Sequence, residues 1–224
     1  MKPEGGLGGA SFAPPPAVIT GAIVVLCVLV EVVLTLAGPS LRGAVGANAA
    51  LIPARLTGVF VARPGAFPAV ATLLTSLFLH AGWLHLIVNL TFLLWIGRHV
   101  EAVAGHLRFA AIYLLGGIAG GLLQVAVAPH STDQVIGASG AIAGVFGAYA
   151  VLFARSRLAA RRVLGVTIAG EVLTVGWYLA TWIALQLLTG LAFNRGGGGI
   201  AIWTHIGGFA VGLVASHLLV RRLR

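Results

Sequence analysis

Six long apolar segments constrain the fold of this chain more than any other feature of its sequence. They cover residues 17–37, 77–96, 107–128, 135–153, 163–188 and 200–220. A transmembrane α-helix needs roughly 20 mainly apolar residues to cross a hydrocarbon core of ~30 Å. We therefore predict an all-α membrane protein with a bundle of six transmembrane helices. Residues 1–16, rich in glycine and proline, are predicted to form a disordered tail, which leaves residues 17–224 as the membrane domain.

The composition agrees with an integral membrane protein. Hydrophobic residues make up 59% of the chain and charged residues 8%, and the mean hydropathy is +1.03. The net charge of +9 would suit a nucleic-acid partner, but the basic residues flank apolar segments and form no patch interleaved with aromatic residues. The lipid bilayer is therefore the expected partner, and nucleic acid is not. With a single cysteine, Cys27, and dispersed histidines, we predict no internal disulfide, metal site or cofactor.

The distribution of lysine and arginine predicts the orientation in the membrane. With the N-terminus inside, ten of the 14 basic residues lie on the inner side. The four exceptions are Arg42, Arg55, Arg63 and Arg195. We expect both termini to be cytoplasmic, in a bacterial-type plasma membrane. The long connection over residues 40–75 is interrupted by prolines, and connections of this length are more often functional than idle.

Four polar residues are predicted to lie at similar depth in three of the helices. Segments 77–96, 135–153 and 200–220 all run from outside to inside in this orientation. Ser139 lies about four residues into its segment and His205 about five, which places both roughly 6–8 Å below the outer helix ends. His85 and Asn89 lie one turn apart on one helix face, slightly deeper. Small residues allow the helices to approach closely; these are Gly140, Gly144, Gly147, Gly208 and Gly212.

This arrangement predicts the chemistry of acyl transfer. A serine hydroxyl needs an adjacent base to become a nucleophile near neutral pH, and His205 is the candidate base for Ser139. N–H groups of His85, Asn89 and the Ser139 amide can stabilise the tetrahedral oxyanion. The alternatives are a packing role for Ser139 and, for His85 and Asn89, an interhelical hydrogen bond that fastens their helix. The chain has five acidic residues, and none is well placed as a third catalytic member, although Asp133 stays open; they are Glu4, Glu31, Glu101, Asp133 and Glu171.

Three motifs in these segments resemble those of rhomboid intramembrane serine proteases, over about residues 73–212. They are residues 80–89 (HAGWLHLIVN), residues 137–140 (GASG) and residues 204–208 (THIGG) followed by Gly212. The resemblance implies a six-helix core, Ser139 as nucleophile, His205 as base, and His85, Asn89 and the Ser139 amide at the oxyanion. It also implies a structural role for Glu101. The implied substrates are single-span membrane proteins cut within or beside their transmembrane helix.

The chain departs from the family pattern at two places. Many members carry a Trp-Arg pair in the first loop, where this chain has Ala71 and Thr72. Many also place an aromatic ring on the catalytic imidazole one turn after the serine, where this chain has Ala143. Trp203 and Phe146 are the rings that we consider as substitutes. His80 and Trp83 are expected at the outer membrane interface.

Two other functions compete with a protease. A catalytically silent rhomboid-like protein would bind membrane clients, and the intact Ser139 and His205 argue against it. A small transporter would use a polar path through Glu31, Gln124, Glu171 and the histidines. The absence of internal repeats, together with polar groups gathered near one face, weakens that reading.

Overall fold

The computed structural model describes residues 16–59, 67–153, 160–163, 166–193 and 201–223. Most of these residues are helical, which confirms the predicted all-α class. The predicted tail falls largely on residues 1–15, outside the described residues. The elements in chain order are α1 (Val18–Ala49), α2 (Pro53–Leu56), η1 (Ala69–Ala71), α3 (Thr72–Thr75), η2 (Ser76–Phe78), α4 (Trp83–Phe92), the π-helical turn η3 (Leu93–Gly97), α5 (Arg98–Ala104), α6 (His106–Val127), α7 (Ser139–Phe153), β1 (Arg161–Val163), β2 (Val166–Ile168), α8 (Gly170–Phe193) and α9 (Ile202–Leu223).

Three helices among the described residues are long and apolar enough to cross a membrane. They are Val18–Ala49, Trp83–Ala104 and His106–Val127. Apolar stretches in α7, α8 and α9 are shorter. The protein is therefore an integral membrane protein, and the count of six spans stays a prediction.

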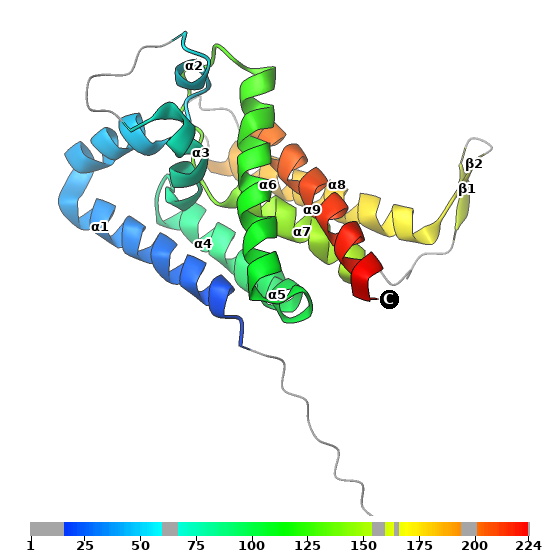
Figure 1. The fold of residues 1–224 in the computed structure, drawn as a ribbon. Helices are drawn as coiled ribbons and strands as arrows, with labels where there is room; N and C mark the ends of the chain where they lie inside the picture. The colour runs from blue at the N-terminus through cyan, green and yellow to red at the C-terminus, as the bar shows by residue number, and fades with distance from the viewer. Residues whose placement is uncertain (1–15, 60–66, 154–159, 164–165, 194–200, 224) are drawn as a thin grey trace, which may run out of the picture.

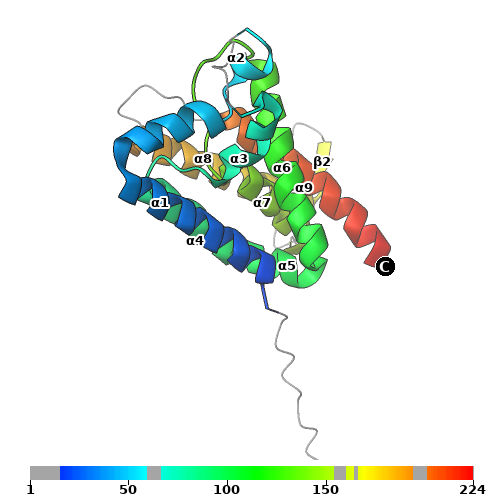
Figure 2. The same cartoon turned by 60° about the vertical axis from the view of Figure 1, so that its left-hand side comes forward.

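Glycines bring α6, α7 and α9 into close contact, and the three helices lie together in both views (Figures 1 and 2). A Cβ added to Gly144 would lie 3.1 Å from the Cα of Gly116 and 3.3 Å from the carbonyl oxygen of Gly208. A Cβ at Gly208 or Gly212 would overlap the carbonyl oxygens of Gly140 and Gly144, respectively. Only glycine allows backbones to approach this closely. The predicted glycine-mediated packing of α7 against α9 is confirmed, and Gly116 adds α6 to it.

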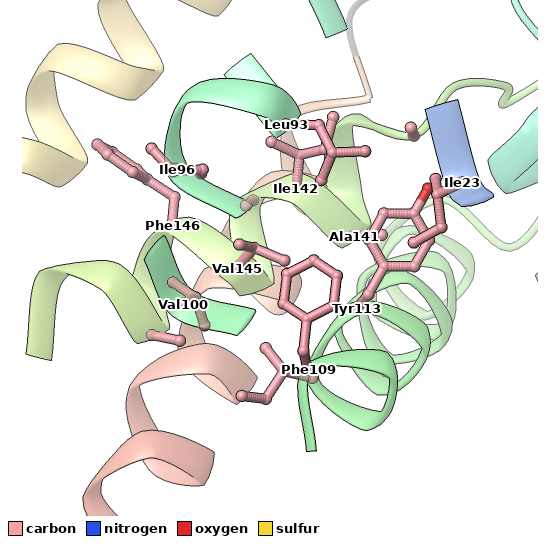
Figure 3. Close-up of a cluster of buried hydrophobic side chains, with 14 of the residues drawn as sticks. Ile23, Leu93, Ile96, Val100, Phe109, Tyr113, Ala141, Ile142, Val145 and Phe146 are labelled. Atoms are coloured by element: carbon pink, nitrogen blue, oxygen red, sulfur yellow. The ribbon is translucent and has the colours of Figure 1, made fainter. Parts of the chain in front are cut away.

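The hydrophobic core fills the space between α1, α4–η3, α6 and α7 (Figure 3). Phe109 and Tyr113 on α6 are 0% and 1% exposed, and their rings meet small and branched side chains of α7 such as Val145. Leu93 and Ile96, on η3, are fully buried on the opposite side of α7. α7 is thus surrounded on most of its faces, which fixes the element that carries Ser139.

Helix α1 lies alongside α4 (Figures 1 and 2). A buried carboxylate holds the N-terminal end of α1 in this position. Glu101, 1% exposed, accepts hydrogen bonds from the N–H groups of Ile19 and Thr20, both at 2.8 Å, and from the Thr20 hydroxyl at 2.7 Å. The first-turn N–H groups of a helix have no intrahelical acceptor, so a carboxylate is stabilised there. The contacts support the structural role expected of Glu101.

The first predicted segment ends at Gly38 as expected, because φ is 84° there, but a second helical part follows Pro39 and continues to Ala49. Two other predicted segment boundaries were wrong, each for a local reason. The second segment begins at Trp83 rather than residue 77, because Gly82 has φ 136°, and it continues to Ala104. Residues predicted to open the fifth segment form instead the hairpin β1–β2, so α8 begins at Gly170.

The first connection contains short helices and is joined to the connection that precedes α7. Leu51 and Val135 exchange backbone hydrogen bonds of 3.2 and 2.8 Å. The Ala54 N–H donates to the Ser131 carbonyl at 3.0 Å. Arg55, 6% exposed, donates to the carbonyls of Ala47, Asn48 and Phe67. Arg55 therefore stabilises the backbone of the first connection, which explains why a basic residue lies on the side predicted to be outside.

Candidate active site

Ser139 is the first residue of α7, not the fourth residue of a helix as predicted. Gly137, with φ 121°, turns the chain, and its N–H donates to the carbonyl of Ser76 at 3.0 Å. The first helical hydrogen bond runs from the Ile142 N–H to the Ala138 carbonyl, at 2.9 Å. First-turn N–H groups have no intrahelical acceptor and carry the positive end of the helix dipole. The Ser139 amide is thus suited to bind a negative oxygen.

His205, on the first turn of α9, lies in hydrogen-bond contact with Ser139. Its Nε2 is 2.8 Å from the Ser139 Oγ, although the two residues are 66 positions apart. The preceding residue, Thr204, has a backbone that packs against Gly120 and Gly140, which holds this turn of α9 close to α6 and α7. His205 is 3% exposed. The structure therefore brings the predicted nucleophile, which is partly buried, into contact with a buried base.

The second nitrogen of His205 has no carboxylate beside it in the described part of the chain. Its Nδ1 is buried without a hydrogen-bond partner among those residues. Asp133, the acid that the sequence left open, lies in an exposed turn where it accepts a hydrogen bond from the Ser131 hydroxyl at 3.2 Å. The arrangement has the two members of a dyad.

His85 presents one ring nitrogen to the turn before Ser139. Its Nδ1 accepts a hydrogen bond from the Ala81 N–H at 3.3 Å. In a neutral imidazole the other nitrogen, Nε2, then carries the proton. A Cβ added to Gly137 would lie 2.9 Å from this Nε2 and 3.8 Å from the Ser139 Oγ. His85 is therefore placed to donate toward the reacting centre.

Asn89 lies one turn further along α4 and is joined to His85 rather than to Ser139. Its Nδ2 donates to the His85 carbonyl at 2.8 Å. Its Oδ1 is buried without a partner among the described residues. The structure thus brings Ser139, His205 and the His85 ring together, and attaches Asn89 to the group through the α4 backbone.

Trp182, on α8, supplies the aromatic wall of His205, and the sequence did not reveal it. The two rings meet edge to face, with centroids 6.3 Å apart and an interplanar angle of 77°. Trp182 is 2% exposed, and the Phe146 ring packs against it with centroids 5.5 Å apart. Of the two rings considered as substitutes, Phe146 supports the wall, whereas Trp203 is 39% exposed. Trp182 lies outside all three motifs, so the sequence carried no signal for it.

His80 is buried against His85, which corrects its predicted place at the membrane interface. It is 3% exposed, and its ring meets the His85 ring edge to face with centroids 5.2 Å apart. Burial, reinforced by the neighbouring His85, lowers the pKa of His80 to about 3. His80 is therefore a neutral packing partner of His85 at physiological pH.

Replacing Ala143 with phenylalanine is expected to lower stability and impair activity. Ala143 is 0% exposed, and Trp182 already forms the aromatic wall, so a second ring has no space. Overpacking a core usually costs about 1–3 kcal/mol. Thermal melting of the detergent-solubilised protein measures the loss, with Ala128→Phe, at the end of α6, as the matched control. An unchanged melting temperature with higher kcat would show that the ring of His205 lacks a wall.

Comparison with known proteins identifies relatives of this chain. A family model described as the rhomboid domain matches residues 68–222. RHOMBOID-like protein 4 of Arabidopsis thaliana is 32% identical over 67% of this chain, and the match covers 34% of that protein. Inactive rhomboid protein 1 of Danio rerio is 32% identical over 63% of this chain and 15% of its own length. Rhomboid-like protein 11, chloroplastic, of Arabidopsis thaliana is 39% identical over 47% of this chain and 36% of its own length. The chain thus spans little more than a third of these relatives at most.

Proposed function

The chain belongs to the rhomboid family, and we propose that it is an active intramembrane serine endopeptidase in which Ser139 is the nucleophile and His205 the base. The observation that carries the proposal is the 2.8 Å contact between the Ser139 Oγ and the His205 Nε2. This distance is short enough for direct proton transfer. The burial of His205 beside Trp182 restrains the imidazole in one orientation.

The proposed reaction proceeds through an acyl-enzyme. The Ser139 Oγ attacks the carbonyl carbon of the scissile peptide while the His205 Nε2 takes the hydroxyl proton. The resulting imidazolium gives this proton to the leaving nitrogen as the C–N bond breaks, which leaves an ester on Ser139. Water, activated by the same imidazole, then hydrolyses the ester and restores both side chains.

The oxyanion of the tetrahedral intermediate is assigned to donors around the turn before α7. The Ser139 amide is free of the helical hydrogen-bond ladder, and the protonated His85 Nε2 faces Gly137. Asn89 supports this group through the His85 carbonyl, and its second amide hydrogen completes the proposed set. Preorganised donors of this kind each contribute about 10²–10³-fold to kcat.

Transmembrane proteins with a single span are the proposed substrates, cut within or beside their membrane helix. Support comes from the position of the dyad on apolar helices of a membrane protein, where His205 is buried and Ser139 is partly buried. A six-span arrangement in a bacterial-type plasma membrane, with both termini cytoplasmic, completes the proposal. It places the first turns of α7 and α9 toward the outer face.

Cysteine labelling is expected to reveal this orientation. In a Cys27→Ser background, Thr132→Cys should react with an impermeant maleimide added to intact cells, and Arg108→Cys should react only after lysis. Both positions are exposed; Arg108 lies in the first turn of α6, and Thr132 lies in the connection that follows the other end of this helix. The reverse pattern would place the dyad toward the cytoplasm. The sequence also predicts that a cysteine at Gly197 is accessible from outside and one at Ser156 is not, but both positions lie outside the described residues.

A catalytically silent, client-binding protein is the second candidate, because several relatives are named inactive rhomboid proteins. A fluorophosphonate probe separates the two, since it forms a covalent bond only with an activated serine. We expect the purified protein to be labelled, and the label to disappear in Ser139→Ala. Ser131→Ala, at a half-buried serine outside the dyad, is the control and should label like wild type. A folded wild-type protein that takes no label would favour the silent alternative.

A further inference from the structure

A partly buried ion pair joins the two halves of α1 across the bend at Gly38. Glu31, 1% exposed, lies before the bend, and Arg42 lies after it. The Arg42 Nη2 donates to the Glu31 Oε1 at 2.7 Å, and its Nη1 donates to the Oε2 at 3.3 Å. Removing a carboxylate from water is costly unless it is paired in this way. Glu31 therefore fixes the position of the guanidinium.

The same guanidinium reaches the loop that precedes α4. The Arg42 Nη1 donates to the carbonyl oxygen of His80 at 3.3 Å. That carbonyl shares a planar peptide unit with the N–H of Ala81. The Ala81 N–H is the group that donates to the His85 Nδ1, at 3.3 Å. One peptide group thus connects Arg42 on its oxygen side with the ring of His85 on its nitrogen side.

This connection determines which nitrogen of His85 carries the proton. An N–H donor at Nδ1 requires Nδ1 to be an acceptor, so the proton of the neutral ring lies on Nε2. A cation on the carbonyl polarises the amide and strengthens its N–H as a donor. The Nε2 is the atom that faces Gly137 and Ser139.

We propose that Glu31, Arg42 and the His80–Ala81 peptide form a relay that holds His85 in the tautomer and orientation needed to donate to the reacting centre. Glu31 and Arg42 are positioning residues, because they act only through His85. The inference rests on the proposed protease function for its effect on turnover, but the tautomer of His85 does not depend on that function.

A double-mutant cycle between Arg42 and His85 tests the relay. Arg42→Met should lower kcat by about 10²-fold, the scale of one oxyanion donor, with little change in KM. In a His85→Ala background the same substitution should change kcat less than about 2-fold, because its target is gone. Arg42→Lys should restore only part of the loss, since an ammonium lacks the fork that serves both Glu31 and the His80 carbonyl. Equal losses in both backgrounds would reduce the pair to a structural tie and overturn the relay.

Thr35→Val is the matched control, because the Thr35 hydroxyl accepts a hydrogen bond from the same Arg42 Nη2 at 3.3 Å on the exposed side. It should leave kcat unchanged. The ¹⁵N resonances of the His85 ring, assigned by their loss in His85→Ala, give a readout that needs no cleavage. We expect a protonated Nε2 in wild type and in Thr35→Val, and a mixture of tautomers in Arg42→Met. The same tautomer in wild type and Arg42→Met would overturn the relay even in a protein that cleaves normally.

Discussion

Replacing His205 with glutamine is expected to reduce kcat/KM by about 10⁴-fold or more while the protein stays folded. The 2.8 Å contact makes His205 the base for Ser139, and members of a nucleophile–base pair act as a unit, so that losing one removes most of the catalysis. Initial rates on a fluorogenic transmembrane substrate measure the loss. Thermal melting shows that the variant still folds.

His217→Gln is the matched control for this substitution. His217 is an exposed histidine on the same helix, three turns from His205. Its replacement should leave kcat/KM within about 2-fold of wild type. A His205→Gln protein that kept more than about a tenth of wild-type activity would exclude His205 as the base.

Replacing Gly137 with alanine is expected to damage both the turn and the oxyanion site. With φ at 121°, a residue with a side chain is strained, at a cost of order 1–3 kcal/mol. The new methyl group would also lie 2.9 Å from the His85 Nε2, a distance that forces the ring to move. Displacing one oxyanion donor lowers kcat by about 10²–10³-fold. Kinetics and thermal melting on the same preparation separate the two effects.

Gly58→Ala separates strain from displacement. Gly58 also has a positive φ, 76°, but an added Cβ would meet no atom within 4 Å. This control should lower the melting temperature and leave kcat unchanged. A Gly137→Ala protein that lost only stability, like the control, would show that the His85 ring does not need its present position.

The juxtaposition of Ser139 and His205 could be predicted from the sequence because helix geometry fixes depth. Apolar segments that alternate in direction along the predicted bundle set the level expected for each residue in the membrane. The glycines of α7 and α9 indicated the faces that meet. The predicted depths themselves were too large, since α7 begins at Ser139. Hydrophobic periodicity does not detect a glycine with a positive φ, such as Gly137, that delays the start of a helix.

Other parts of the site depend on tertiary contacts that no motif records. Trp182 reaches His205 from α8. The predicted start of this helix was wrong, because the residues before Gly170 form a hairpin. Arg42 was interpreted only as an exception to the charge asymmetry, whereas it binds a buried glutamate and a loop carbonyl. The contact between Arg42 and Glu31 follows from the bend at Gly38, which brings residues on both sides of it together. The effect of that bend could not be derived from residue spacing.

We propose that the contacting pair of Ser139 and His205 hydrolyses peptide bonds of membrane proteins. The most direct measurement is mass spectrometry of the products formed when the purified protein is mixed, in lipid vesicles, with a panel of single-span transmembrane substrates. We predict new, complementary N- and C-terminal fragments with wild type, and none with Ser139→Ala of equal melting temperature. Fragments that persist with Ser139→Ala, or an absence of fragments across the panel with a wild-type protein that also fails to label with fluorophosphonate, would contradict it.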